Sequence, residues 1–243
     1  MGKLERLNSL LQRLGFEMVR YDKGTNGILR RNGIFEKYNV DLIIDVGANT
    51  GIYGKEVRQV GYDGQIVSYE PLTNAFEKLI VNIKNDSRWK AYNFALGSEN
   101  SKQFINVSAN SHSSSILEIS DTHTKAETSA AYVGKQEIQI KTLDSVFDDI
   151  KGRSSEIFLK IDTQGFELNV LKGAENSLGK IHTIQLEMSL QPLYVGQPLY
   201  KDLMAFLHSN DYTLLDVEPG FADSKTGSLL QFDGIFRKSK FIK

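Results

Sequence analysis

Short apolar runs alternate with helical patterns along most of this chain. The runs that are typical of buried strands lie at 42–46, 65–70, 91–96, 157–162 and 183–187. Apolar residues recur at helical spacing between these runs, over 57–60, 76–83 and 168–178. Strand and helix in alternation predict an α/β fold in which helices cover both faces of a parallel sheet.

The last part of the chain departs from this alternation. Apolar spacing over 199–207 predicts one more helix, and the runs at 212–217 and 229–236 predict two strands. The segment 218–228 between them has no helical pattern, and a crossover to a parallel neighbour normally needs a helix. We therefore expect these two strands to be antiparallel, with the last one at or near an edge of the sheet.

The first 40 residues are expected to form an N-terminal helical extension. An amphipathic helix is predicted by apolar residues at helical spacing, namely Leu4, Leu7, Leu11, Leu14 and Met18. We expect this helix to pack on the main core, and a dimerisation arm is the alternative. Three glycines between residues 24 and 33 predict a loop. The remainder, residues 41–243, is expected to form one domain.

The segment 108–130 interrupts the pattern of strands and helices. Ten of its 23 residues are Ser or Thr, and few are apolar. One interpretation is a solvated, mobile loop. The other is a lid over a site at the strand ends, because long loops in compact domains are often functional.

Composition and charge exclude several classes of protein. The 243 residues include 29 Lys and Arg and 30 Asp and Glu, so the net charge of −1 lacks the basic footprint of proteins that bind nucleic acid or anionic membranes. The absence of cysteine excludes disulfide scaffolds, thiolate metal sites and cysteine nucleophiles. No apolar run approaches 18 residues, and the first six residues are unlike a signal peptide. We expect a cytoplasmic protein without a membrane span or a nucleic-acid partner.

Candidate chemistry lies at the carboxyl ends of the predicted strands, where open α/β sheets bind their ligands. The turn after the first strand has the spacing Gly47-x-x-x-Gly51-x-x-Gly54, which is neither the dinucleotide fingerprint nor a phosphate-binding P-loop. Glu70 ends the second strand, 19 residues after Gly51, and a carboxylate there can bind both ribose hydroxyls. Together, these features predict a ligand that contains a nucleoside.

Motifs in a fixed order span about residues 40 to 237. They are the segment 45–53, Tyr69-Glu70-Pro71, the segment 93–97, Thr142-Leu143-Asp144 and the segment 159–174. With these motifs the chain resembles the FkbM-type methyltransferases, which use S-adenosylmethionine. The same similarity extends to Gln185-Leu186-Glu187 and to Asp233-Gly234-Ile235-Phe236. The resemblance implies a Rossmann-like class I methyltransferase fold, with a seven-stranded, mostly parallel sheet whose last strand is antiparallel.

The resemblance also implies a cofactor site and an acceptor. The implied cofactor residues are Gly47, Asn49 and Gly51 for the methionine part, Glu70 for the ribose, Ala95 and Leu96 for the adenine, and Asp45, Tyr53, Pro71 and Asn74 elsewhere in the site. The implied acceptor is a small-molecule or glycan hydroxyl. Many members have Asp-x-Glu-Gly-x-Glu where this chain has Gln164 as the third residue, which weakens any role of that position in binding metal or a proton.

Methyl transfer to an alcohol requires alignment of the acceptor oxygen and removal of its proton. Asp162 and Glu187, at the ends of neighbouring strands, are the candidate general bases or orienting groups. The structural alternatives are a helix N-cap for Asp162 and a carboxylate satisfied by loop amides for Glu187. A further hypothesis has both carboxylates holding one Mg²⁺. His112 is the third catalytic candidate, since a lid could bring it over the acceptor, although a solvated histidine is the alternative.

Two function classes follow from the sequence. The leading one is an S-adenosylmethionine-dependent O-methyltransferase that acts on a hydroxyl of a saccharide, glycolipid or secondary metabolite. The alternative is a non-catalytic module that uses a methyltransferase fold to hold S-adenosylmethionine or S-adenosylhomocysteine. Retention of both Asp162 and Glu187 argues against such a module.

Overall fold

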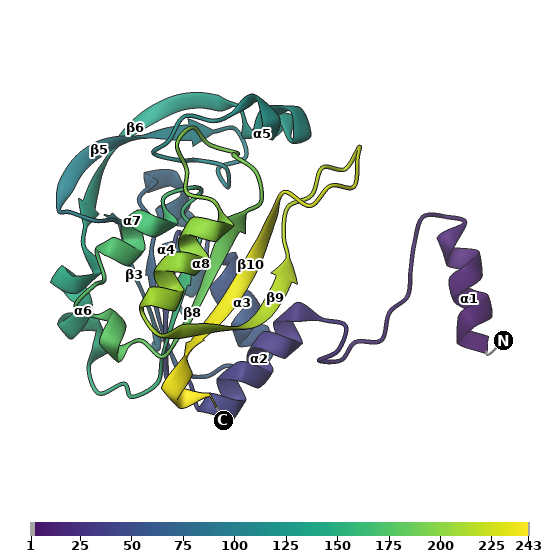
Figure 1. The fold of residues 1–243 in the computed structure, drawn as a ribbon, viewed down its shortest axis with the longest axis horizontal. Coiled ribbons are helices and arrows are strands. Elements are labelled where there is room, and N and C mark those ends of the chain that lie inside the picture. Colours follow the sequence, from purple (N-terminus) through teal and green to yellow (C-terminus); the bar gives the residue numbers. More distant parts are fainter. Residues whose placement is uncertain (1–2, 243) are drawn as a thin grey trace.

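A seven-stranded sheet forms the centre of the computed structural model, which describes residues 3–242 (Figure 1). Residues 1, 2 and 243, which the expected extension and domain include, lie outside the described residues. The strand order is β3-β2-β1-β7-β8-β10-β9. The strands are β1 (Leu42–Val46), β2 (Gln65–Tyr69), β3 (Trp89–Tyr92), β7 (Ile157–Ile161), β8 (Thr183–Ser189), β9 (Tyr212–Pro219) and β10 (Gln231–Lys238).

The strand directions confirm the expected class I methyltransferase fold. Neighbouring strands from β3 to β8 are parallel, and β10 is antiparallel to both β8 and β9. The last strand therefore lies one position from the edge, as the missing crossover helix indicated. Strand order reverses between β1 and β7, and this is where such sheets bind ligands.

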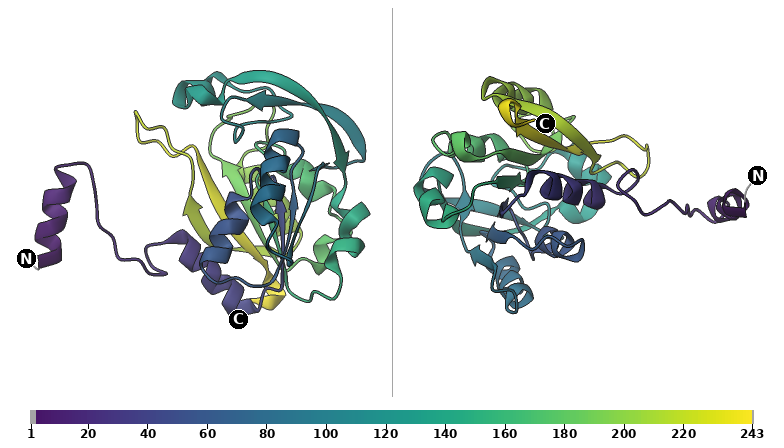
Figure 2. Two further views of the ribbon diagram at one scale, coloured as in Figure 1. Left: turned by 180° about the vertical axis from the view of Figure 1, so that it is seen from behind. Right: turned by 90° about the horizontal axis from the view of Figure 1, so that it is seen from below.

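Helices cover both faces of the sheet (Figure 2). One face packs against α2 (Gly27–Tyr38), α3 (Ile52–Gln59) and α4 (Thr73–Ile83). The other face packs against α6 (Leu143–Lys151), α7 (Glu167–Lys172) and α8 (Tyr200–Ser209). Because β1 is covered on both sides, all five of its residues are buried, and its apolar side chains divide between the two cores.

The strand expected over 91–96 is two strands in different sheets. β3 ends at Tyr92, and Ala95–Leu96 forms β4 of a second, three-stranded sheet with β5 (Ser101–Ser108) and β6 (Tyr132–Lys141). The chain breaks direction at Asn93, whose side-chain amide donates hydrogen bonds to the carbonyls of Glu70 and Pro71, at 2.8 and 3.1 Å. The second sheet lies across the carboxyl ends of the central strands (Figure 1).

The Ser/Thr-rich segment 108–130 is folded and partly buried, which contradicts the interpretation as a solvated loop. It contains α5 (Asp121–Ala126) and a short 3₁₀ turn (Thr128–Ala130), and Ser113, Ser114 and Ser115 are buried. The Ser115 hydroxyl donates to the carbonyl of Gln164 at 2.6 Å. Its serine hydroxyls are satisfied by neighbouring polar groups, so a polar composition is compatible with burial.

Helix α1 (Lys3–Gln12) stands apart from the domain (Figures 1 and 2), contrary to the expected packing on the core. Its leucines at positions 4, 7 and 10 are exposed to solvent. No helix within residues 3–242 has both the length and the apolar character needed to cross a membrane.

The loop expected between residues 24 and 33 was also wrong, because α2 begins at Gly27. The side chain of Asn26 caps this helix by accepting a hydrogen bond from the amide of Leu29. Phe35 is buried and packs edge-on against Phe158 of β7. Glycine costs a helix about 1 kcal/mol relative to alanine, and this tertiary packing outweighs that cost at Gly27 and Gly33.

Candidate active site

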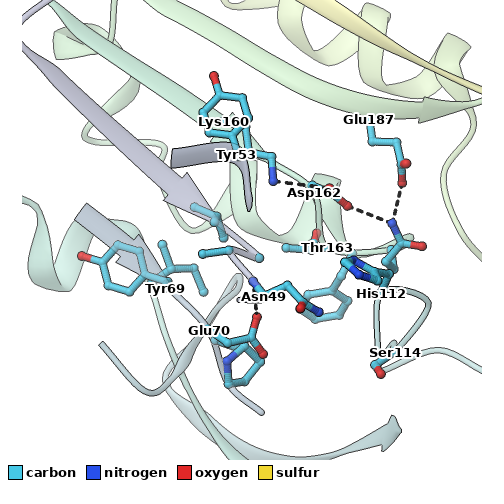
Figure 3. Close-up of a pocket in the computed structure, with 18 of the residues that line it drawn as sticks. Asn49, Tyr53, Tyr69, Glu70, His112, Ser114, Lys160, Asp162, Thr163 and Glu187 are labelled. Atoms are coloured by element: carbon cyan, nitrogen blue, oxygen red, sulfur yellow. Dashed lines mark hydrogen bonds and ion pairs between the residues drawn. The ribbon is translucent and has the colours of Figure 1, made fainter. Parts of the chain in front are cut away.

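A cavity of about 390 Å³ lies at the carboxyl ends of β1, β2, β7 and β8, within the size range of small-molecule sites (Figure 3). Ten of the thirteen predicted site residues line it: Gly47, Asn49, Tyr53, Glu70, Pro71, Ala95, Leu96, His112, Asp162 and Glu187. The three others, Asp45, Gly51 and Asn74, do not. The strand-end argument therefore located the pocket correctly.

The turn after β1 is held in a conformation that requires glycine. Gly47 has φ +79°, and a Cβ at this position would collide with the carbonyl oxygen of Asp162. The amides of Gly47 and Ala48 both donate to the carbonyl of Tyr69 at 3.0 Å. The turn is thus fixed against the ends of β2 and β7, and its backbone forms part of the cavity wall.

Glu70 lies on the cavity wall at the end of β2 and is almost fully buried. Its two carboxylate oxygens accept hydrogen bonds from the amides of Asn49 and Leu72, each at 2.8 Å. Burial raises the pKa of Glu70 to about 7, against the opposing effect of these hydrogen bonds. Each oxygen keeps a second lone pair, so the carboxylate fits the two hydroxyls of a ribose.

An apolar wall adjoins Glu70. Ala95 and Leu96 line the cavity as predicted, together with Leu72 and with Ile105 and Ile138 of the second sheet. This wall suits the flat, apolar face of an adenine. Sequence reasoning missed the two isoleucines because nothing in their strands shows that the second sheet covers the pocket.

The three predicted residues that do not line the cavity are either buried in the fold or exposed on its surface. Asp45 is fully buried and accepts a hydrogen bond from the Ser68 hydroxyl at 3.1 Å. A Cβ on Gly51 would meet Leu79 and the Trp89 ring rather than the cavity, so this glycine serves packing. Asn74 is exposed on α4.

The opposite side of the cavity is rich in charge. The Lys160 ammonium is almost fully buried and lies 3.3 Å from Asp162 Oδ2 and 3.4 Å from Asp45 Oδ1. Burial alone would lower the pKa of Lys160, but the two carboxylates raise it above its ordinary value. Lys160 therefore remains an ammonium at neutral pH and cannot accept a proton.

Gln164 bridges the two predicted catalytic carboxylates. Its Nε2 donates to Asp162 Oδ1 and to Glu187 Oε2, both at 2.8 Å, and its Oε1 accepts from the Tyr194 hydroxyl at 2.7 Å. An amide N–H group thus lies between the carboxylates, where a Mg²⁺ ion would need oxygen ligands, so the metal hypothesis does not fit. Within residues 3–242 no group of three or more acidic or histidine side chains could hold a metal ion.

The structural alternatives for the two carboxylates were also wrong. The N-cap of α7 is Phe166, and Asp162 caps no helix. Glu187 accepts hydrogen bonds from two side chains, Gln164 and Gln231, rather than from loop amides. Burial raises the pKa of Glu187, and repulsion from Asp162 and Asp233 raises it further. Asp162 and Glu187 therefore line the pocket, and Asp162 is not a helix cap.

His112 lies on the cavity wall but is itself exposed. It belongs to the Ser/Thr-rich segment. The other wall residues that sequence reasoning had not named as site residues include Arg31, Glu56, Lys160, Gln185 and Asp233. Two sequence signals could have found some of them. One is the pair of polar residues at alternate positions of a buried strand, Gln185 and Glu187, and the other is the family motif that begins at Asp233.

Residues 45–214 match the methyltransferase FkbM domain family. The chain belongs to this family. It is therefore a methyltransferase that uses S-adenosylmethionine as its methyl donor. No curated protein gives a significant match to the sequence.

The following solved structures are similar to this chain at low sequence identity. A candidate O-methyltransferase from Klebsiella pneumoniae is 11% identical, with a TM-score of 0.50 over 97% of this chain and 89% of that one. An rRNA methylase from Streptococcus thermophilus is 7% identical, with a TM-score of 0.48 over 91% and 98%. Fibrillarin from Aeropyrum pernix, solved with bound S-adenosylmethionine, is 9% identical, with a TM-score of 0.46 over 81% and 66%.

Proposed function

We propose that this FkbM-family methyltransferase methylates a hydroxyl group of a saccharide, a glycolipid or another secondary metabolite. The observation that supports this is the division of one cavity into two chemically different sides. One side has a glycine turn, Glu70 and an apolar wall, and the other has Asp162 and Glu187. We further propose that it works in the cytoplasm, with which its lack of cysteine agrees.

The first side, which we call the cofactor side, is proposed to hold the methyl donor. The turn at Gly47 and Asn49 would contact its methionine part, Glu70 its ribose, and Ala95 and Leu96 its adenine. S-adenosylmethionine supplies a methyl group on a sulfonium that is already activated. The chain then has only to orient the acceptor and remove its proton.

The second side, which we call the acceptor side, is proposed to orient the hydroxyl group. Carboxylate oxygens accept hydrogen bonds, so Asp162 and Glu187 match an acceptor rich in hydroxyl donors. Their own positions are held by Gln164 and Lys160, which provides the pre-organisation that alignment requires. The exposed His112 is proposed to contact the acceptor at the rim.

The test follows the methyl group. S-adenosylmethionine labelled with ¹³C in its methyl group is incubated with the protein and a panel of methyl glycosides and hydroxylated metabolites. We expect S-adenosylhomocysteine to form only when an acceptor is present, and the label to appear in a methyl ether. Label on nitrogen would contradict O-methylation. Tight binding of S-adenosylhomocysteine without turnover on any acceptor would favour the non-catalytic module.

A further inference from the structure

Four carboxylates lie in one row across four neighbouring strands at the acceptor side. Asp233 of β10 lies directly opposite Glu187 of β8 and opposite Glu218 of β9. Asp162 extends the row, since it follows the register pair Ile161 and Leu186. Residues in register across a sheet project to the same face, so the four side chains point toward α2. We call Asp162, Glu187, Asp233 and Glu218 the carboxylate row.

Three members of the carboxylate row are already engaged. Asp162 accepts hydrogen bonds from Lys160 and Gln164. Glu187 Oε2 accepts two amide hydrogen bonds, from Gln164 at 2.8 Å and from Gln231 at 2.7 Å. Glu218 is ion-paired with the buried guanidinium of Arg31 on α2.

Asp233 is the exception. It lines the cavity and is half-buried, yet no donor within residues 3–242 makes a hydrogen bond to its side chain. A carboxylate that lines the cavity and has no protein donor is suited to accept a hydrogen bond from a ligand. A hydroxyl group of the proposed substrate would supply such a donor.

We propose that Asp233 receives the proton of the acceptor hydroxyl; this inference rests on the proposed function. In the step, the acceptor oxygen forms a bond to the methyl carbon and the carbon–sulfur bond breaks, leaving its electron pair on sulfur. The hydroxyl proton passes to a carboxylate oxygen of Asp233. The products are a methyl ether, S-adenosylhomocysteine and a protonated Asp233, so charge and atoms balance.

The charged surroundings of Asp233 suit this role. The groups that face it from the neighbouring elements are Arg31, Lys160, Asp162, Glu187 and Glu218. Burial raises the pKa of Asp233 to about 6, and the charge of Asp162 adds to this, while Arg31 and Lys160 oppose it. With this pKa, Asp233 is ionised at neutral pH. It is also basic enough to take a proton, because a general base works best when its pKa lies near the working pH.

The other charged groups of the pocket are proposed to position the acceptor. Lys160 is held as an ammonium, and the engaged oxygens of Asp162 and Glu187 are held by amides. These two carboxylates orient the substrate through their remaining lone pairs. Sequence reasoning gave the base role to them because Asp233 lies in an antiparallel strand, where the strand-end rule does not apply.

The experiment compares Asp233→Asn with Asp216→Asn, a control on the adjacent strand β9, whose carboxylate pairs with Arg30 outside the pocket. Single-turnover rates are measured from pH 5 to 9, with saturating S-adenosylmethionine and the methyl glycoside that the wild-type enzyme methylates fastest. We expect Asp233→Asn to lower the rate at least 100-fold at pH 8 and to abolish its rise around pH 6. Asp216→Asn should match the wild type, and Asp233→Glu should keep the pH-dependent rise at a lower rate.

A result in which Asp233→Asn keeps both the rate and its pH dependence would overturn the proposal. So would loss of the pH-dependent rise in Glu187→Gln but not in Asp233→Asn. If the wild-type enzyme methylates no hydroxyl, the result instead contradicts the proposed function. The role of Asp233 as proton acceptor then fails with it.

A second measurement does not need an acceptor. The carboxyl ¹³C resonance that disappears in Asp233→Asn is titrated in wild-type protein with bound S-adenosylhomocysteine. A midpoint between pH 5 and 7 supports the proposal, and a carboxyl group that stays ionised below pH 4 or protonated above pH 9 contradicts it.

Discussion

The two sides of the cavity are built in different ways. The cofactor side consists of a backbone turn, one carboxylate and an apolar wall, and its key residues lie within short segments around Gly47 and Glu70. The acceptor side consists of side chains that converge from α2, β7, β8 and β10. Apart from its apolar wall, the proposed cofactor side is specified by short local segments, whereas the proposed acceptor side is assembled by the tertiary fold.

The largest expected effect is a loss of stability on substitution of Gly47, where the two sides of the cavity meet. Gly47→Ala forces a left-handed conformation, which costs 1–2 kcal/mol, and drives a Cβ into the carbonyl of Asp162. With overpacking against a backbone that cannot yield, we expect the free energy of unfolding to fall by about 4 kcal/mol. Denaturant unfolding measures this. Gly61→Ala is the matched control, since Gly61 also has positive φ but no atom near its Cβ, and it should lose about 1–2 kcal/mol.

The protein should lose stability when the buried charge that α2 contributes to the acceptor side, that of Arg31, is removed. Arg31→Met leaves Glu218 buried without its partner, and we expect a loss of about 3 kcal/mol in the free energy of unfolding. The double variant Arg31→Met with Glu218→Met should recover most of it, because neither charge is then left alone. A double variant as unstable as the single one would show that the ion pair itself is not responsible.

The cofactor side should respond to pH through Glu70. Ionised Glu70 is proposed to accept the ribose hydroxyls. Because burial raises its pKa to about 7, affinity for S-adenosylhomocysteine should increase as pH rises through 7. About one tenth of the carboxylate is ionised at pH 6 and nine tenths at pH 8, which predicts an increase of about tenfold. Calorimetric titration at both values measures the change. In Glu70→Gln the affinity should be weaker and independent of pH over this interval.

The smallest effect is expected at the rim. His112 is exposed and on the cavity wall, so His112→Ala should change turnover by no more than about threefold, as for most surface positions. Steady-state kinetics with the preferred acceptor measures it. A loss of 100-fold with an altered pH profile would instead assign the proton transfer to His112.

The turn and the carboxylate of the proposed cofactor side were predictable from the sequence because their signals are local. A glycine that must have positive φ and an acidic residue at a strand end are both visible in a short segment, as with Gly47 and Glu70. The antiparallel position of β10 was predictable for the same reason, since the missing crossover helix is a local feature. Gly51 shows the limit, because a glycine needed for packing against Leu79 looks like one needed for a ligand.

The rest of the site depends on contacts between distant segments. The helix at Gly27–Tyr38 was missed because Phe35 stabilises it by packing on Phe158, which local propensity does not report. Arg31 reaches the pocket only because of this helix. Asp233 lies on the pocket wall because β10 pairs with β8 in the register that places Asp233 opposite Glu187. The burial of Ser115 likewise depends on a partner, Gln164, that lies far along the chain.

The central proposal is that one side of the cavity binds the cofactor and the other binds the acceptor. It is tested most directly by the affinity for S-adenosylhomocysteine, because this measurement requires no acceptor. Calorimetric titration at pH 8 compares the wild type with Glu70→Gln, Glu187→Gln and Asp233→Asn, after thermal unfolding has shown each variant to be folded. We predict that Glu70→Gln weakens binding about 10- to 100-fold, the loss expected for hydrogen bonds to a charged group, while the other two variants stay within about twofold. Equal weakening in all three variants would contradict the account.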